Sequence, residues 1–419
     1  MKKTNFLFIT EWNNDFLILK LKQEGHNIKI HPTKYGRAFK GILNKNDYVK
    51  DWKSFVDWAD IIIFDSVGHG AEADRLRKQG KKVIGGSRYT DKLELDREFG
   101  QKELQKTGIK ILKETEFDSK SKVIRFIRKN PKRYVFKPCG TSDMDTTFIG
   151  EAKDGKDLIE LIKSDKRLNK IKKFFLQEYV QGIEVAVGAF FNGNDFVEPI
   201  NVNFEHKRLF TGDLGPLTWE MGTLICFTKQ KKLFNKTLLK LKNKIKESGY
   251  VGYLDINCIV NKDGIHPLEF TSRFGYPHAA IMWEGSKDNA AETIIKFVSG
   301  KKCYWAPEKG FNIGIVITTP PFPYHDKIEL KKYADLPIEF KDKKLAGIYF
   351  SDVIKKDDKF LTDGFTPLIV AAHAQTFEKA RKVVYERVKK ISIENMYYRT
   401  DIGSKWIVAS KKLRKLGYV

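Results

Sequence analysis

The sequence predicts an α/β protein in three parts: an N-terminal doubly wound parallel sheet, a central α+β domain and a small C-terminal α+β domain. Strand-like and helix-like segments alternate in the first part, which is the pattern of a parallel sheet. β-Prone runs around glycine turns dominate the middle, and short strands separated by turns follow. We place the three domains at residues 1–107, 108–300 and 301–419.

The composition indicates a folded protein. Of the 419 residues, 41% are hydrophobic and 13% aromatic, which is ample for packed cores. The four cysteines lie far apart without a CxxC pair, which favours free thiols in a reducing compartment. No run approaches the ~18 apolar residues of a membrane span, and the apolar run before Glu11 is too short for a signal peptide. We expect a cytoplasmic protein with no membrane association.

The net charge of +24 raises nucleic-acid binding as an alternative function. However, the lysines are spread along the chain, and the cluster at 236–246 repeats Lys and Leu at the spacing of a solvated amphipathic helix. The usual nucleic-acid signatures, such as paired aromatics or zinc-ligand spacing, do not occur in the sequence. We therefore expect no nucleic-acid partner. Lysine-rich coding bias or an anionic small substrate would explain the charge.

The first domain should alternate strands and helices. The expected strands are 5–10, 26–31, 61–65 and 82–84, and the expected helices are 13–25, 52–60, 71–79 and 91–107. In such sheets, ligands sit beyond the carboxyl ends of the strands. Two glycine-rich turns, 65–70 and 85–88, fall there. Their backbone amides would suit a phosphate or a sugar, although ordinary turns between strand and helix are also glycine-rich.

The central domain places a lysine at the end of a strand. Lys137 closes the expected strand 134–137 and opens the loop 138–150, which is rich in Gly, Ser and Thr. Its amides and hydroxyls, together with the lysine ammonium, could meet phosphate. It is not a Walker A loop, because no helix beginning Gly-Lys-Ser/Thr follows. A plain surface hairpin is the alternative.

Two further polar segments follow that loop. The strand-like segment 174–184 breaks at Gly182; backbone groups from Glu178 to Val180 could bind an adenine edge, and Glu184 could accept from ribose hydroxyls. The loop 205–216 is dense with charge, and its side chains could equally be ordinary solvated surface groups. A basic helix is expected over residues 234–248.

A predicted β-hairpin brings the chemistry-bearing side chains together. Its two runs are 253–260 and 265–270, joined by Asn261-Lys262-Asp263-Gly264. Asp255 and Asn257 share one face of the first strand, and Glu269 and Thr271 share one face of the second. Pairing the strands places an acid from each at one site, close to Arg273. Such a site suits Mg²⁺ and phosphate oxygens, and a solvated hairpin with scattered charges is the alternative.

The C-terminal domain should be a small α+β unit packed on the middle domain. The expected strands are 312–318, 338–340, 347–350 and 368–372, and the expected helix is 377–390. The segment 318–324 contains three prolines and cannot be a central strand.

These residues occur in the order of an ATP-grasp enzyme, and the chain resembles glycinamide ribonucleotide synthetase (phosphoribosylamine–glycine ligase) from end to end. The segments that carry the resemblance are Leu93-Glu-Leu-Asp-Arg-Glu-Phe99, Gln177-Glu-Tyr-Val-Gln-Gly-Ile-Glu184, Glu205-His-Lys-Arg208 with Gly212-Asp-Leu-Gly-Pro-Leu-Thr-Trp-Glu-Met-Gly222, Glu269-Phe-Thr-Ser-Arg-Phe-Gly-Tyr-Pro-His278 and Tyr398-Arg-Thr-Asp-Ile-Gly403.

The resemblance implies an ADP-forming ligase of the purine-biosynthesis type with a central ATP-grasp domain. ATP would phosphorylate a carboxylate, and an amine would attack the acyl phosphate to give an amide. The implied cofactors are ATP and Mg²⁺, or Mn²⁺ in its place. The implied partners are small molecules, namely an amino acid or other carboxylate and a phosphorylated amine. The implied assembly is a monomer or a homodimer.

The resemblance also implies roles for individual residues. The implied catalytic residues are Arg273, Lys207 and Asp213, and the implied metal ligands are Asp255 and Glu269, with Asn257 as a substitute for the family's metal asparagine. The implied ATP-binding residues are Lys137, Glu178, Val180, Glu184 and Lys102. The implied substrate-binding residues are Asp65, Gly68, Gly70, Ser87, Arg88, His206, Trp219 and Glu220.

The chain departs from the family pattern at several of these places. Thr271 stands where a metal asparagine is expected, and Gln101 where a lysine is expected. Trp219 and Glu220 replace two glycines beside the acceptor pocket, within the family segment 212–222. Tyr276 and His278 replace two acids within the family segment 269–278. The pattern leaves two reactions open, namely phosphoribosylamine–glycine ligation itself and a divergent ligation that joins an amino acid to a different amine, such as a modified nucleotide. A catalytically weak nucleotide-binding protein is a further alternative.

Overall fold

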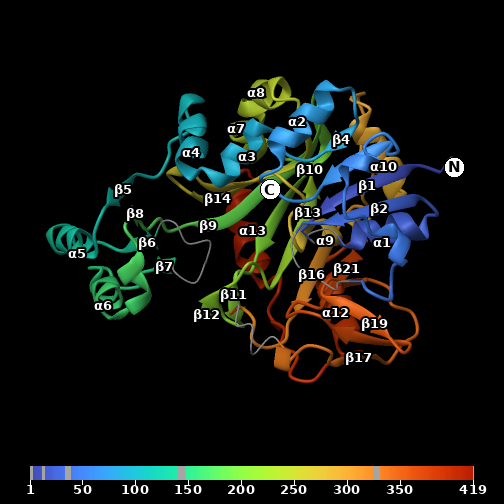
Figure 1. The fold of residues 1–419 in the computed structure, drawn as a ribbon. Helices are drawn as coiled ribbons and strands as arrows, with labels where there is room; N and C mark the ends of the chain where they lie inside the picture. The colour runs from blue at the N-terminus through green and yellow to red at the C-terminus, as the bar shows by residue number, and fades with distance from the viewer. Residues whose placement is uncertain (1–2, 12–14, 34–38, 139–146, 325–330, 419) are drawn as a thin grey trace.

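The structure, a computed structural model, describes residues 3–11, 15–33, 39–138, 147–324 and 331–418 (Figure 1). Within these residues the strands form one eight-stranded sheet, three four-stranded sheets and a two-stranded ribbon. No helix in the described ranges is both long and apolar enough to cross a bilayer.

The N-terminal sheet is parallel throughout, as expected, with the strand order β2-β1-β3-β4. Its strands are β1 (Asn5–Thr10), β2 (Asn27–Pro32), β3 (Ile61–Phe64) and β4 (Val83–Ile84), and its helices include α1 (Asp15–Gln23) and α2 (Gly70–Lys78). Every residue of β3 is buried, which is typical of a parallel strand covered on both faces. Gly85 extends this sheet's edge by donating its N–H to the Val251 carbonyl at 2.8 Å.

Three expected helices are interrupted or reduced. The segment 52–60 forms only a short 3₁₀ turn, Lys53–Phe55. The segment 91–107 is two helices, α3 (Arg88–Leu95) and α4 (Arg97–Lys106), because Asp96 leaves the helical conformation and its side chain caps α4. The basic segment breaks at Thr237, whose backbone is not helical, so that α7 (Lys232–Lys236), η5 (Leu238–Leu241) and α8 (Lys242–Glu247) replace one helix.

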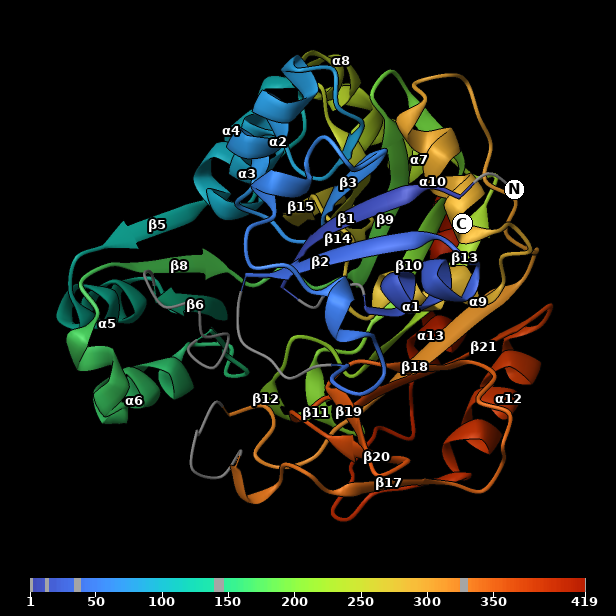
Figure 2. The same cartoon turned by 45° about the vertical axis from the view of Figure 1, so that its right-hand side comes forward.

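A small unit projects from the main body (Figures 1 and 2). It contains β5 (Glu114–Phe117), α5 (Lys120–Lys129), β6 (Tyr134–Pro138), β7 (Phe148–Ile149), α6 (Lys156–Ser164) and β8 (Phe174–Glu178), with the strand order β5-β8-β6-β7. The helices bury one face each against the sheet and form a separate core, in which Phe136 stacks on Phe174 at 5.6 Å. Residues 139–146 of the expected phosphate loop lie outside the described residues.

The eight-stranded sheet forms the centre of the main body. Its order is β15-β14-β9-β10-β13-β16-β21-β18, and every neighbouring pair is antiparallel. The strands are β9 (Ile183–Asn192), β10 (Phe196–Glu205), β13 (Gly222–Thr228), β14 (Val251–Asn261), β15 (Gly264–Thr271), β16 (Phe311–Ile317), β18 (Ile348–Phe350) and β21 (Leu368–Ala374). Because β16, β18 and β21 follow residue 300, one sheet continues from the central part of the chain into the C-terminal part.

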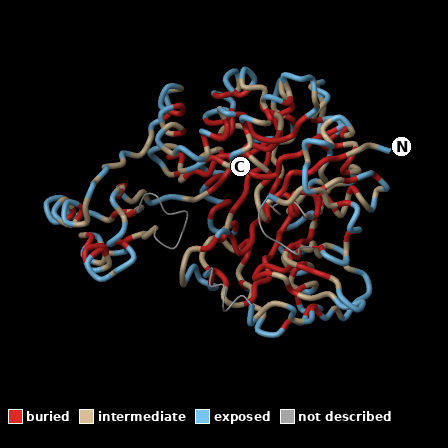
Figure 3. The backbone as a smooth tube through the Cα atoms, viewed as in Figure 1, coloured by how far each residue is buried: buried red, intermediate tan, exposed pale blue. Residues whose placement is uncertain are grey.

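Both faces of this sheet are covered, and buried residues concentrate around it (Figure 3). Alternate side chains of β9 illustrate this: Phe190 belongs to one core and Phe191 to another. On the Phe190 side, α9 (His278–Glu284) and α10 (Ala290–Val298) share a core with the N-terminal sheet. On the other side lie α12 (Phe377–Val388) and α13 (Ser404–Leu416).

Two smaller β elements complete the fold. The C-terminal sheet has the order β19-β20-β17-β22, from strands Val353–Lys356, Lys359–Thr362, Pro337–Phe340 and Ile391–Ser392. The ribbon pairs β11 (Arg208–Phe210) with β12 (Leu214–Leu217).

The predicted hairpin is confirmed as β14 and β15. Asn257 faces Glu269 across the pair, and Asp255 faces Thr271. The hairpin thus brings the expected acids and amide to neighbouring positions of one sheet edge.

Phe190 is the hub of an aromatic cluster that ties α9 and α10 to the sheet. Its ring lies 4.4–5.8 Å from five others, those of Tyr253, Phe274, Trp283, Phe297 and Trp305. We expect Phe190→Ala to lower the free energy of unfolding by about 3–5 kcal/mol, because it leaves a cavity among these rings. Chemical denaturation measures this loss. Leu95→Ala, at a side chain 64% exposed, is the control, and equal losses in both variants would contradict the assignment.

Candidate active site

A cavity of about 790 Å³ opens where the N-terminal sheet, α3, the eight-stranded sheet and the C-terminal part meet. Its lining among the described residues is Glu11, Ser66, Val67, Glu94, Glu205, Lys207, Trp219, Glu220, Asp255, Asn257, Glu269, Phe270, Thr271, Arg273, Gly275, Tyr276, His278, Ser351, Asp352, Phe365 and Thr366. Seven of these residues are Asp or Glu and two are Lys or Arg. The cavity lining therefore has a strong excess of acidic over basic side chains.

Lys207 lies between two of the carboxylates. Its Nζ is 2.7 Å from Oε1 of Glu269 and 3.2 Å from Oε2 of Glu205. The Lys207 ammonium holds the pKa of Glu269 at about 2. Burial opposes the charge on Lys207, but the surrounding carboxylates raise its pKa well above the usual value. Burial, Glu184 and Glu269 together raise the pKa of Glu205 in spite of Lys207. The charges of Lys207, Glu205 and Glu269 therefore depend on one another, because each is buried and is stabilised by an opposite charge beside it.

Asp255 lies deeper in the cavity wall. Burial, and then the charge of Glu205, raises the pKa of its carboxyl well above the usual range. The side chains of Asn203 and Thr271 act in the opposite direction and lower this pKa, and the Tyr253 hydroxyl donates to Oδ2 of Asp255 at 3.5 Å. Gly188 faces Asp255 on the adjacent strand, and a β-carbon at that position would collide with Asp255 and Tyr253. The glycine thus leaves room for the carboxylate.

Asn257 presents an oxygen to the same region. Its Nδ2 donates to Oε1 of Glu184 at 3.0 Å and to Oε2 of Glu205 at 3.4 Å. Its Oδ1 is buried and has no hydrogen-bond partner among the described residues. An unsatisfied amide oxygen beside carboxylates is a donor set that suits a hard divalent cation. Even so, no three His, Cys, Asp or Glu side chains in the described ranges converge as a ready metal site.

Lys137 projects from the small unit. Its Nζ is 2.8 Å from Oε1 of Glu114 and 2.5 Å from Oε1 of Gln177. Glu114 also contacts Arg97, at 3.3 Å, and so links the small sheet to α4. Burial, and then the charge of Arg97, lowers the pKa of Lys137 to about 8. Lys137 and Glu269 also interact electrostatically, so the small sheet and the hairpin face one site.

Arg273 and Lys102, two further expected site residues, each pair with a carboxylate. Arg273 donates from Nε to Oε1 of Glu94 at 3.0 Å, and Glu94 also accepts from the Ser272 N–H at 2.6 Å. Lys102 lies on the exposed face of α4, where it pairs with Glu98 at 2.5 Å.

The other expected ATP-binding residues follow the strands of the small unit. Glu178 ends β8 and pairs with Lys132 at 2.7 Å, while Val180 is half-buried in the connection to β9. Gln101, at the expected lysine position, donates to the carbonyls of Pro267 and Leu268 and so ties α4 to β15.

The expected substrate turns of the N-terminal sheet make mainly internal contacts. Asp65 accepts from the Thr10 hydroxyl and from the Glu11 N–H. Gly70 donates its N–H to Oδ2 of Asp91 at 2.6 Å, and Gly68 adopts a positive φ of 98°.

The second turn serves as a helix start. Ser87 caps α3 through Thr90, and its hydroxyl also donates to Ser248 at 2.9 Å. The Arg88 N–H donates to Asp74. Among the described residues of the two turns, Ser66 and Val67 are the ones that line the cavity.

His206 and Asp213 lie at the junction with the C-terminal part. Asp213 pairs with the fully buried guanidinium of Arg399 at 2.8 Å, and Arg399 also pairs with Asp401 at 2.7 Å. His206 Nε2 accepts from the Gly403 N–H at 3.0 Å. Burial, and then the charge of Lys405, lowers the pKa of His206 to about 3, so it is neutral at physiological pH. Neither His206 nor Asp213 is among the residues that line the cavity.

Trp219 and Glu220 do line the cavity. Trp219 is 45% exposed, and its ring lies 6.0 Å from Phe322 and 5.8 Å from Phe365. Glu220 is buried, and burial followed by the charge of Glu205 raises its pKa well above the usual value.

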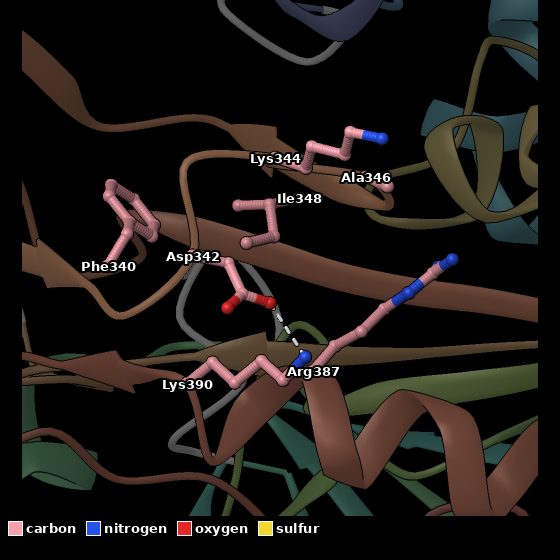
Figure 4. Close-up of a pocket in the computed structure, with 7 residues that line it drawn as sticks. All are labelled: Phe340, Asp342, Lys344, Ala346, Ile348, Arg387 and Lys390. Atoms are coloured by element: carbon pink, nitrogen blue, oxygen red, sulfur yellow. Dashed lines mark hydrogen bonds and ion pairs between the residues drawn. The ribbon is translucent and has the colours of Figure 1, made fainter.

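A second hollow, of about 150 Å³, lies in the C-terminal part (Figure 4). It contains Lys344, Arg387 and Lys390, but Lys390 pairs with Asp342 at 2.7 Å and Arg387 pairs with Glu284. This hollow is small. Among the described residues, Glu220 Oε1 and Asn257 Oδ1 of the main cavity are buried without a hydrogen-bond partner, and no such atom belongs to the residues that line the second hollow.

Sequence reasoning missed several of the site's groups. Glu94, Arg97 and Glu205 stand inside the quoted family segments, but their roles depend on which neighbours the fold brings to them. Asp352 gave no signal, because it comes from a short turn after β18 that only the tertiary structure places at the cavity.

Comparison with known proteins gives a consistent result. The family model for the ATP-grasp (A) domain of phosphoribosylglycinamide synthetase matches residues 95–279, and that for its C domain matches residues 314–405. The phosphoribosylamine–glycine ligase of Streptococcus pneumoniae (strain R6) is 25% identical over 90% of this chain and 93% of its own length. That of Thermotoga maritima is 26% identical over 91% and 94%, respectively.

Solved structures show the same fold. The Thermotoga maritima phosphoribosylamine–glycine ligase superposes with a TM-score of 0.71 at 21% identity, covering 95% of this chain and all of that one. The biotin carboxylase subunit of pyruvate carboxylase superposes with a TM-score of 0.57 at 12% identity, over 99% and 96% of the two chains. The likeness extends over nearly the whole chain.

The Arg399 network should stabilise the junction rather than act in chemistry. We expect Arg399→Met to lower the free energy of unfolding by about 3 kcal/mol, because it leaves Asp213 and Asp401 without their buried partner. The matched control is Lys390→Met, at a half-exposed ion pair, for which about 0.5 kcal/mol is expected. Chemical denaturation distinguishes the two variants, and an equal loss in both would contradict this structural role.

Proposed function

The chain belongs to the phosphoribosylglycinamide synthetase family of ATP-grasp proteins, and from this premise we propose that it is an ADP-forming ligase that joins a carboxylate to an amine. The observation that carries the proposal is the ion pair between Glu269 of the hairpin and Lys207, beside which Lys137 of the small sheet also interacts electrostatically with Glu269. Cations beside a cluster of carboxylates suit the transfer of a phosphoryl group from ATP to a substrate carboxylate.

We assign nucleotide binding to the space between the small sheet and the hairpin. Lys137 would hold phosphate oxygens, since its ammonium is the cation that the small sheet directs toward Glu269. Glu184, which already orients Asn257, would accept from the ribose. The backbone from Glu178 to Val180 would meet the adenine edge. Lys102 is exposed on α4 and would contribute only if the small unit moves toward it.

The acids of the hairpin fit a divalent cation. Glu269 and Asn257 face each other across the strands, and the unsatisfied Asn257 Oδ1 is the group that most needs a cation. Asp255, deeper in the cavity wall, would add a further carboxylate oxygen to the cation site. Bound Mg²⁺ or Mn²⁺ would offset charge on the phosphate oxygens. Thr271, at the family's asparagine position, offers a hydroxyl and no amide, so we assign the amide ligand to Asn257, whose Oδ1 has no hydrogen-bond partner among the described residues.

The chain's own cations would then act on the acyl transfer. Lys207 and Arg273 would steady the phosphoryl group as a carboxylate oxygen attacks the terminal phosphorus and ADP leaves. The ammonium form of the amine would first lose a proton to solvent, and the neutral amine would attack the acyl carbon. The carbon–oxygen bond to phosphate would break with its electron pair going to phosphate, and the nitrogen would lose a second proton to solvent to give the neutral amide. The products are an amide, ADP and inorganic phosphate.

The relatives are named phosphoribosylamine–glycine ligases, so glycine and phosphoribosylamine are the first substrates to test. A second candidate is ligation of an amino acid to a different amine. The large side chain of Trp219 in the cavity wall, where the family pattern has glycine, favours this second candidate.

Removing either end of the phosphate site should stop turnover. We expect Lys137→Ala and Glu269→Gln each to reduce ADP formation by about 100-fold or more, because each removes a charge that faces the transferring phosphoryl group. A coupled assay for ADP measures the loss. Controls with the same chemistry are Lys163→Ala and Glu160→Gln, which remove an exposed ion pair of the small unit. Undiminished turnover in either site variant would show that the phosphate site lies elsewhere.

Nucleotide affinity should depend on the charge of Lys137. Its lowered pKa of about 8 means that the ammonium is present at pH 7 and lost as the pH rises above 8. We therefore expect ATP affinity to fall by about tenfold between pH 7 and pH 9, and the fall to disappear in Lys137→Arg, whose charge persists. Isothermal titration calorimetry measures both. An affinity that is flat with pH in the native protein would contradict this role.

A further inference from the structure

One end of the main cavity is built from aromatic rings beside a carboxylate. Trp219, Phe322 and Phe365 lie within 5.7–6.0 Å of one another. Trp219 and Phe365 line the cavity, and Asp352 and Thr366 line it next to them. We call these four cavity residues the aromatic end. An exposed tryptophan face is a surface that attracts apolar groups and cations.

Asp352 is a desolvated carboxylate at this end. Its Oδ2 accepts from the Thr366 N–H at 3.0 Å and from the Thr366 hydroxyl at 2.8 Å. Burial raises the pKa of the Asp352 carboxyl, with the Thr366 bonds acting in the opposite direction. No Lys, Arg or His in the described ranges forms an ion pair with it. Asp352 is half-buried, and a partly desolvated carboxylate of this kind gains from a cation supplied by a ligand.

The rest of the described cavity is poorly equipped for a phosphorylated amine. Its two cations are already paired, Lys207 with Glu269 and Glu205, and Arg273 with Glu94. The turn groups expected to hold a phosphate are engaged within the protein: the Gly70 N–H with Asp91, and the Ser87 hydroxyl with Ser248. A phosphate near the aromatic end would lie beside Asp352 and would be repelled.

We propose that the aromatic end binds the amine substrate, and that this substrate is an unphosphorylated amine that is cationic in solution and carries an apolar or aromatic group. Asp352 pairs with the ammonium group of the arriving substrate, which gives up a proton to solvent before the neutral amine attacks, and the Trp219 ring covers the apolar part. This inference rests on the proposed ligase function, because it names the amine that the ligase would use. Asp352 and Trp219 then determine specificity and do not take part in phosphoryl transfer.

Calorimetry with the full-length protein tests the recognition directly. The probes are tyramine, its neutral analogue tyrosol, and phosphoethanolamine. We expect tyramine to bind about tenfold or more tightly than either of the others, because only it offers Asp352 a charge-assisted hydrogen bond without a phosphate. This comparison needs no variant. Equal or tighter binding of phosphoethanolamine would overturn the proposal.

Variants then locate the site. Asp352→Asn should weaken tyramine binding by about tenfold and leave tyrosol binding unchanged, whereas Trp219→Gly should weaken both. Asp342→Asn is the matched control, since Asp342 belongs to the other hollow in the C-terminal part (Figure 4) and should change neither. An unchanged tyramine affinity in Asp352→Asn would overturn the assignment.

ADP formation with ATP, the common amino acids and each amine separates this inference from the ligase proposal. Turnover with tyramine-like amines that shows a raised KM in Asp352→Asn, at nearly unchanged kcat, supports both. Turnover with phosphoribosylamine alone leaves the ligase proposal standing and overturns the inference. Asp352-dependent tyramine binding without ADP formation from any acid supports the amine site and contradicts the ligase proposal.

Discussion

The site depends on how a dense group of carboxylates is kept charged inside the protein. Glu205, Asp255 and Glu269 converge on one side of the eight-stranded sheet, and burial disfavours their charges. Lys207 offsets part of that cost by bridging Glu205 and Glu269. The unsatisfied oxygen of Asn257 and the raised pKa of Asp255 show that the offset is incomplete. A site in this condition favours ligands that bring positive charge, which accounts for both a divalent cation and a cationic substrate.

The architecture explains how such a site is held. The hairpin belongs to a sheet that continues into the C-terminal part, so the acids stand on a rigid support whose far strands also carry Asp352 and Phe365 into the same cavity. The small unit has its own core and reaches the site through Lys137 and the Glu114 bridge to Arg97. A separate core, joined to the main body through this ionic link among the described residues, is the arrangement expected of a unit that can shift when a nucleotide binds.

Local pattern was enough to predict part of this arrangement. The alternation of side chains along two runs around an Asp-Gly turn gave the hairpin, and the two-residue period placed Asp255 and Asn257 on one face. What failed was decided by tertiary contacts. The segment 52–60 has apolar residues at helical spacing that pack against the N-terminal core, yet it forms only a 3₁₀ turn. Thr237 breaks a run of good helix formers, and its hydroxyl bonds the Leu233 carbonyl there. Ser87 and Gly70 have the composition of a phosphate turn, yet they bond Ser248 and Asp91, which no sequence pattern reveals.

The central claim is that a carboxylate is activated by phosphorylation above the hairpin acids. The most direct measurement supplies amino acids labelled with ¹⁸O in the carboxylate, together with ATP, Mg²⁺ and an amine, and follows the label in inorganic phosphate by mass spectrometry. The account predicts that each phosphate released with ADP carries an ¹⁸O atom from the acid. Release of ADP with unlabelled phosphate would contradict it.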